Sequence, residues 1–84
     1  MNICFFAGKV ISEIDFRFIL TGKNYCAVKF TLELFDGTFV NLLGYDDVAD
    51  YSYRKMKNGD VIFCEAVLGE TDVVVDYVEL VQGG

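Results

Sequence analysis

Residues 24–44 read NYCAVKFTLELFDGTFVNLLG, and this stretch decides the fold. In its first half, apolar and polar side chains alternate at every second position, which is typical of a β-strand with one buried face. The face expected to lie inward consists of Cys26, Val28, Phe30, Leu32 and Leu34. Asp36-Gly37 is a strong signal for a tight hairpin turn. The stretch therefore predicts two antiparallel strands joined at residues 36–37.

The returning strand is expected over residues 38–44, where Val40 and Leu42 continue the inward face. The alternate positions of this strand then point outward, and they are Phe39, Asn41 and Leu43. On the preceding strand the outward positions are Ala27, Lys29, Thr31 and Glu33. The hairpin is therefore expected to present rings and polar groups together on its outer face.

The rest of the chain predicts three more strands and one helix. Residues 3–11 form a nearly continuous apolar run, 15–20 continue the extended pattern, and 61–68 and 73–81 form the last two strands. Gly8 indicates a bend where another backbone approaches closely. Turns are expected at 21–24 and at 69–72, the second short enough for a plain hairpin.

The helix is expected to start at a cap provided by Asp46 or Asp47 and to run to about residue 57, before Asn58-Gly59. Ala49, Tyr53 and Met56 fall at helical spacing and are expected to pack on the sheet. Three basic residues in the last turn complement the helix dipole, and they are Arg54, Lys55 and Lys57. Five strands with a helix between the third and fourth are the layout of the all-β, Greek-key OB-fold barrel, here expected as a single domain over residues 1–84.

Composition narrows the function classes. The 84 residues are 54% hydrophobic and contain no histidine, which removes the commonest general base and the commonest metal ligand. The three cysteines lie far apart in apolar runs, which predicts small buried side chains, not a zinc site or a disulfide framework. No secretory signal, membrane span, phosphate-binding glycine loop or nucleophile motif is found. We therefore expect a cytoplasmic, non-enzymatic protein without metal or cofactor.

The charge is unevenly distributed. Seven Lys and Arg stand against thirteen Asp and Glu, which gives a net charge of -6. Residues 1–57 hold all seven bases and seven of the acids, whereas residues 58–84 hold six acids and no base. The total charge alone disfavours a polyanionic partner. The proposed outer face, however, lies in the neutral part of the chain.

Several short stretches, in this order and spacing, resemble bacterial and phage single-stranded DNA-binding proteins. FAGKV at residues 6–10 followed by DFRF at 15–18 resembles the opening of that family, and EAVL at 65–68 resembles its "EG-x-L" step with Ala66 in place of glycine. The other matching stretches are 21–22, 27–32, 45–49 and 53–61. The chain also resembles the primosomal replication protein N relatives of this family, which keep the barrel, lack the tail and assemble as dimers. The resemblance implies the OB-fold and a role in DNA replication, recombination or repair.

The resemblance also implies a mechanism and site residues. Single-stranded DNA is bound when bases stack on exposed rings and phosphates follow cations, so the binding tolerates most sequences. The family's aromatic positions fall on Phe39 and Tyr45, and the outward side adds Phe35 as a third ring. The cations near them are Lys29, Arg17 and Lys9. The implied partners are single-stranded DNA, replication proteins and further copies of the chain, a dimer or tetramer through the first strand.

The chain departs from the family in three ways. The hairpins at 36–37 and 69–72 are short, the chain has no tryptophan, and no acidic tail follows the barrel. These departures predict weak binding over a short site. They also leave open an alternative, an OB-fold protein–protein interaction module that has lost nucleic-acid binding, for which the acidic last third of the chain is the argument.

Overall fold

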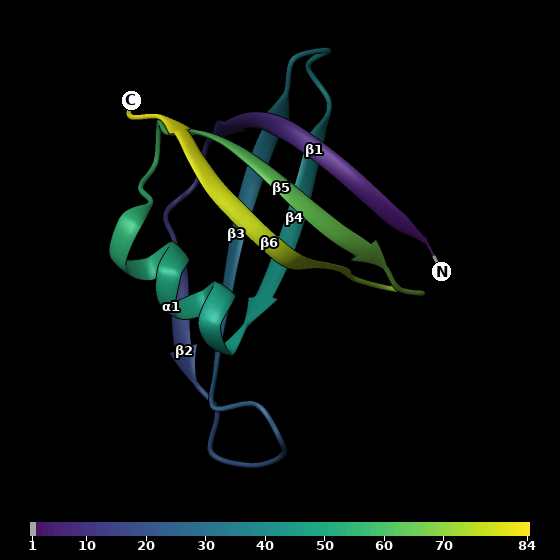
Figure 1. Ribbon diagram of the computed structural model, residues 1–84, viewed down its shortest axis with the longest axis vertical. Helices are drawn as coiled ribbons and strands as arrows, with labels where there is room; N and C mark the ends of the chain where they lie inside the picture. Colours follow the sequence, from purple (N-terminus) through teal and green to yellow (C-terminus); the bar gives the residue numbers. More distant parts are fainter. Residues whose placement is uncertain (1) are drawn as a thin grey trace.

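The computed structural model describes residues 2–84 as six strands and one helix. In chain order the elements are β1 (Ile3–Val10), β2 (Asp15–Phe18), β3 (Cys26–Leu34), β4 (Phe39–Tyr45), α1 (Asp46–Lys55), β5 (Val61–Leu68) and β6 (Val73–Gln82). The strands are ordered β1-β5-β6-β4-β3-β2, and an additional β1–β3 pairing closes five of them into a barrel. Figure 1 shows β1, β5 and β6 crossing over β3 and β4, with α1 beside the lower end of the barrel. The predicted all-β barrel with one helix is confirmed.

β1 and β2 are two parts of one bent strand. β1 pairs with the second half of β3 at Leu32–Leu34, and β2 pairs with its first half at Cys26–Lys29. Between them the chain bulges away from β3, and the Ser12 hydroxyl accepts the backbone N–H of Thr31 at 2.8 Å. The side chain thus replaces a ladder bond that the bend would leave unmade. The extended pattern predicted over residues 15–20 is therefore β2, a short strand that continues the first one.

Gly8 lies where β1 meets β3. A Cβ built at this position would stand 3.0 Å from the carbonyl carbon of Glu33 and 3.2 Å from the Leu34 Cα, and closer still to the Glu33 carbonyl oxygen. The close backbone approach predicted for Gly8 is confirmed. It occurs at the pairing that closes the barrel.

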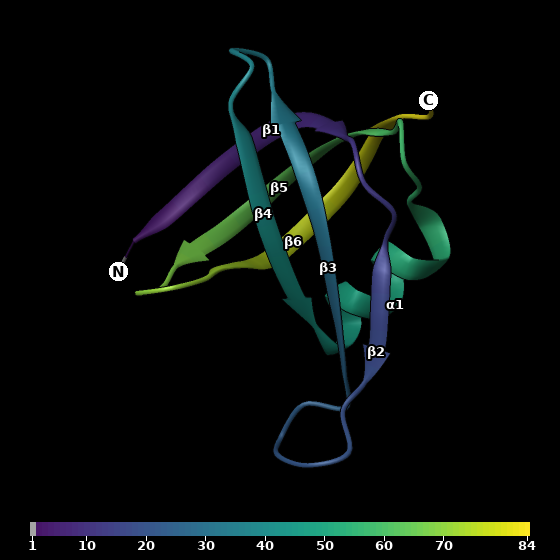
Figure 2. The same ribbon diagram turned by 180° about the vertical axis from the view of Figure 1, so that it is seen from behind.

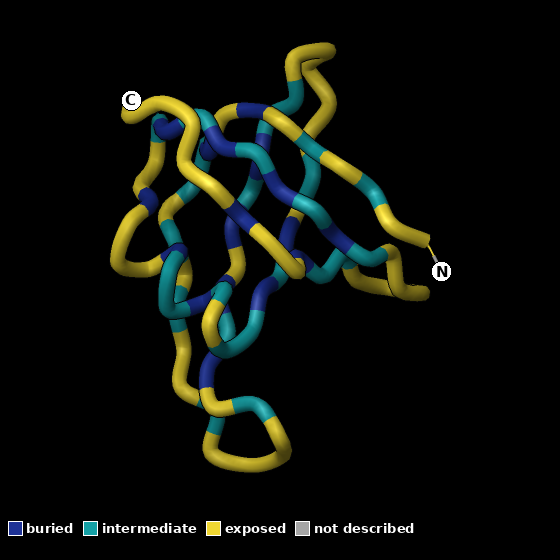
Figure 3. The backbone as a smooth tube through the Cα atoms, viewed as in Figure 1, coloured by how far each residue is buried: buried dark blue, intermediate teal, exposed yellow. Residues whose placement is uncertain are grey.

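The core is formed by the inward residues of the crossing strands. The predicted inward face of β3 is buried at Cys26, Val28, Phe30 and Leu32 and partly buried at Leu34. Figure 3 shows buried segments along the crossing strands, whereas the β3–β4 turn and the β2–β3 loop are exposed. From α1, Ala49 and the following Met56 close one end of this core. Burying each large aliphatic side chain contributes about 1.5–3 kcal/mol.

The predicted helix cap is wrong. Tyr45 is the N-cap residue and makes no side-chain cap hydrogen bond, and Asp46 is the first residue of α1, with φ +53°. The Asp46 carboxylate accepts the backbone N–H of Tyr25 at 2.7 Å and that of Cys26 at 3.4 Å. These N–H groups lie at the start of β3. Because the carboxylate bonds them, it does not cap the N–H groups of α1. Asp46 therefore ties the start of α1 to the start of β3.

The end of the helix and the role of Tyr53 also differ from the prediction. α1 ends at Lys55, and Met56 is already extended. Tyr53 does not pack on the core: 59% of it is exposed, and its ring contacts Phe16 of β2 at 4.7 Å between centroids. The position on the helix that faces the core is taken by Ser52. Helical spacing alone could not predict that β2 lies beside the helix, where Phe16 contacts the ring of Tyr53.

The cysteines follow the predicted pattern in part. Cys26 and Cys64 are buried, whereas Cys4 is half-buried, and all three are free thiols. Burial raises the pKa of the Cys64 thiol to about 11. Within residues 2–84 we find no helix long and apolar enough to cross a membrane.

Candidate functional site

A groove of about 510 Å³ lies over the outer face of β3 and β4. Its floor is formed by side chains of these two strands, among them Lys29, Thr31, Asn41 and Leu43. One wall is the bend between β1 and β2, and the other is the turn between β5 and β6; the wall residues are Ser12, Glu13, Asp15, Thr71, Asp72 and Val73. Figure 2 shows β2, β3 and β4 from this side. Hereafter we call the groove, together with the outer side chains of β2, β3, β4 and the β3–β4 turn and with Lys9 of β1, the groove face.

Polar groups hold the floor of the groove in place. Thr31 and Asn41 are directly opposite each other on β3 and β4. The Thr31 hydroxyl donates to the Asn41 amide oxygen at 2.9 Å. Because this bond uses the amide oxygen, the NH₂ group of Asn41 is the part left to donate to a ligand. The floor thus offers a fixed polar pair between the cross-strand pairs Lys29–Leu43 and Glu33–Phe39.

The predicted aromatic residues lie at the two ends of this floor. Phe39 is opposite Glu33 near the hairpin turn, and Tyr45 is opposite Ala27 at the other end of β4. Both lie on the outer face, about 20 Å apart along the strand at roughly 3.4 Å per residue. Phe39 is 63% exposed, whereas Tyr45 is half-buried. Phe35 follows β3 in the turn and is 80% exposed.

The three predicted cations lie on the same face, but each has a carboxylate beside it. Lys9 is the cross-strand neighbour of Glu33. Lys29 is the cross-strand neighbour of Asp15. Arg17 forms an ion pair with Asp15, with 3.3 Å between Arg17 Nη2 and Asp15 Oδ2. The cations are therefore brought together with the rings, in a setting close to electrical neutrality.

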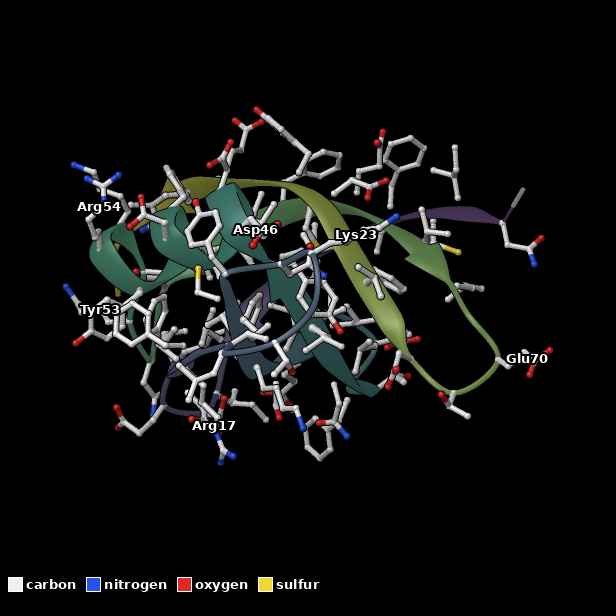
Figure 4. The ribbon with its side chains drawn as sticks, turned by 90° about the horizontal axis from the view of Figure 1, so that it is seen from below. Arg17, Lys23, Asp46, Tyr53, Arg54 and Glu70 are labelled. Carbon is white, nitrogen blue, oxygen red and sulfur yellow. The ribbon has the colours of Figure 1, made fainter. Side chains whose placement is uncertain are left out.

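The basic residues of α1 lie elsewhere. Arg54 forms an ion pair with Asp50, one turn earlier in the helix, at 2.9 Å. Figure 4 shows that Arg54 and Arg17 project from different sides of the molecule. No residue of α1 lines the groove. This placement agrees with the interpretation of the cluster at the end of α1 as a complement to the helix dipole.

Sequence reasoning missed most of the groove walls. Ser12, Glu13, Thr71 and Asp72 come from two loops about 60 residues apart in the chain, and no local pattern marks them. The floor of the groove could be predicted in part, because the alternation of residues in this strand already placed Thr31 outward. What identifies the site is the meeting of both loops over this floor.

Comparison with solved structures shows the same fold in two single-stranded DNA-binding proteins. The mitochondrial single-stranded DNA-binding protein Rim1 of S. cerevisiae matches with a TM-score of 0.84 and 16% identity, over 99% of this chain and 97% of that chain. The SSB domain of a Synechococcus sp. protein matches with a TM-score of 0.79 and 14% identity, over 94% of each chain. The chain has the OB-fold of these domains.

The chain is similar to these two proteins in structure, whereas its sequence identity to them is low. No protein-family model and no curated protein sequence matches the chain. Nevertheless both solved structures are covered almost from end to end, so the fold is shared over nearly the whole of each chain.

Proposed function

We propose that the protein binds single-stranded DNA on the groove face, without strong dependence on sequence. The observation that carries this proposal is the exposed ring of Phe39 on the same face as the groove and Tyr45. Support comes from the fold, which is shared with proteins that are named for binding single-stranded DNA. Stacking suits such a ligand because every base has a π-face.

The predicted rings and cations of the groove face have different roles in this proposal. Phe39 and Tyr45 stack bases at the two ends of β4, and Phe35 extends the stacking surface at the turn. Lys29, Arg17 and Lys9 contact phosphates. In support of this, the pairing of β1, β2 and β4 with β3 brings these cations to the same face as the rings. A stacked base contributes about 1–3 kcal/mol. Two or three rings therefore supply most of the affinity.

The test is a fluorescence anisotropy titration. A labelled oligo-dT of about 30 nucleotides exceeds the site size of one OB-fold, and a duplex of equal length is the control. We expect saturable binding of the single strand that weakens with salt. An RNA oligomer of equal length measures the preference for DNA. Absence of single-strand binding at tens of micromolar would refute the proposal.

The variant Phe39→Ala localises the binding. It removes one exposed ring and should weaken binding by about tenfold, which corresponds to one stacked base. Tyr53→Ala is the matched control, because Tyr53 is also exposed (59%, against 63% for Phe39) but lies on α1, none of whose residues lines the groove. Unfolding of Phe39→Ala would show that this ring belongs to the core. An equal loss in both variants would place the site elsewhere.

We also propose that the protein forms a homo-oligomer through β1. Residues 3–7 of β1 pair with β5, whereas β3 pairs with β1 only at residues 8–10, so one edge of the first half of β1 is unpaired. Beside this edge lies the exposed Phe5, its ring 6.0 Å from that of Phe63. Sedimentation at micromolar concentration tests this, and a 9.5 kDa monomer alone would refute it.

The resemblance to single-stranded DNA-binding proteins supports a place in cytoplasmic DNA replication, recombination or repair, with replication proteins as further partners.

A second candidate function is that of an OB-fold protein–protein interaction module. It is favoured by the acidic groove walls, where Glu13, Asp15 and Asp72 outnumber the single groove cation Lys29. Carboxylates at these positions repel phosphates and attract basic groups of a protein partner. The same titration separates the two candidates, because a module of this kind leaves the oligonucleotide unbound.

A further inference from the structure

We infer that Asp15 is an internal competitor for DNA phosphate, a carboxylate that occupies the phosphate contacts of the groove face when DNA is absent. This inference rests on the proposed single-stranded DNA binding. It assigns to one acidic residue the control of how strongly phosphates contribute to that binding.

The first part of the argument is the ion pair on β2. Arg17 Nε donates to Asp15 Oδ1 at 3.4 Å, and Arg17 Nη2 donates to Asp15 Oδ2 at 3.3 Å. The two N–H groups thus meet both oxygens of one carboxylate. A phosphate presents a similar pair of oxygens to a guanidinium fork. Asp15 therefore fills the position that a phosphate bound to Arg17 would take.

The second part is the position of Asp15 across from Lys29. The two residues are direct partners in the β2–β3 pairing, and both line the groove. Directly opposed residues of antiparallel strands have Cβ atoms about 4.5–5.5 Å apart. One carboxylate therefore lies next to two of the three cations of the groove face.

The consequence is a penalty on contacts made through phosphate alone. A DNA strand that reaches Arg17 and Lys29 must displace Asp15 from Arg17 and must also bring a negative charge close to this carboxylate. Stacked bases do not meet this penalty. Asp15 thus shifts the balance of binding from phosphates toward rings and makes the affinity less dependent on salt.

The chain contains a matched control for this inference. Residues 2–84 hold two ion pairs, Arg17–Asp15 on β2 and Arg54–Asp50 on α1. The side chains of Asp15 and Asp50 are 48% and 49% exposed. Asp15→Asn and Asp50→Asn therefore remove the same charge and release one arginine each. They differ in place, since only Asp15 lines the groove.

The experiment compares oligo-dT binding of the intact protein and both variants at several salt concentrations. Asp15→Asn should bind about fivefold more tightly at low salt, the size expected for the release of one exposed ion pair. Its log–log salt dependence should be steeper by roughly 0.7, the value of one additional phosphate contact. Asp50→Asn should change neither quantity by a comparable amount. In Asp15→Asn/Arg17→Ala most of the gain should disappear.

Two results would overturn the inference. An equal gain in both single variants would mean that only the net charge matters, and no gain in Asp15→Asn would mean that the carboxylate does not compete. Either result, obtained with an intact protein that binds oligo-dT, leaves the proposed function in place. If neither the intact protein nor Asp15→Asn binds oligo-dT, the proposed function itself is refuted, and the inference with it.

Discussion

Replacing Gly8 with alanine should open the barrel at the pairing that closes it. The added methyl group would stand 3.0 Å from the Glu33 carbonyl carbon and 3.2 Å from the Leu34 Cα, and nearer still to the Glu33 oxygen. All three atoms belong to the backbone of β3, so no side-chain rotation relieves the overlap. β1 has to move away from β3, and the three residue pairs between them are strained or lost. Overpacking of this kind costs typically about 1–3 kcal/mol, and we expect the upper end.

The assay is thermal or urea unfolding followed by circular dichroism. In a domain of this size about 3 kcal/mol corresponds to a fall in Tm of roughly 12–24 °C. Gly83→Ala is the matched control, because a Cβ there meets its nearest atom, an Asp60 carboxylate oxygen, at 4.0 Å. That variant should change the stability by less than about 0.5 kcal/mol. Equal stability of the two variants would show that β1 does not approach β3 as closely as described.

Three further predictions concern single side chains. Asp46→Ala should lower the free energy of unfolding in urea by about 2 kcal/mol, because it removes the acceptor of two N–H groups and leaves alanine at φ +53°. Asp46→Asn keeps an acceptor oxygen and should retain most of the stability. In the native protein iodoacetamide should modify Cys4 and not Cys64, whose thiol is buried with its pKa raised to about 11; mass spectrometry showing rapid native labelling of Cys64 would contradict this burial. The hydrogen bond from the Thr38 N–H lowers the pKa of the Asp36 carboxyl below 3.8. Asp36→Ala should therefore be less stable than the intact protein above that pH. The difference in Tm between the two should vanish as the pH falls through the folded-state pKa of Asp36.

The hairpin of β3 and β4 was predictable because its signal is local. Alternation fixes which side chains of a strand point inward, and the Asp36-Gly37 turn fixes the pairing of the two strands. The outward orientation of Phe39 and Lys29 followed from the same alternation. The backbone approach at Gly8 was also predictable, since glycine inside an apolar strand indicates that there is no room for a side chain.

The features that were not predictable depend on contacts between distant parts of the chain. Asp46 has the residue type and the position expected of a helix cap. In the folded protein, however, its carboxylate accepts the backbone N–H groups of Tyr25 and Cys26 at the start of β3. Tyr53 has the spacing of a core residue, but β2 lies beside α1 and offers the ring of Phe16. In both cases a local preference was overridden by a partner about 20 or more residues away.

The same long-range contacts change how the net charge of -6 bears on function. The groove face and its walls bring together three cations, Lys9, Arg17 and Lys29, with four carboxylates, Glu13, Asp15, Glu33 and Asp72. Counterion release scales with the number of phosphates that cations neutralise, so a surface with this balance gains little from phosphates. Stacking on rings does not depend on that balance. If this face binds single-stranded DNA, the exposed ring of Phe39 must contribute more than any one of the cations, and substitutions of the aromatic residues should weaken binding at high salt as much as at low salt.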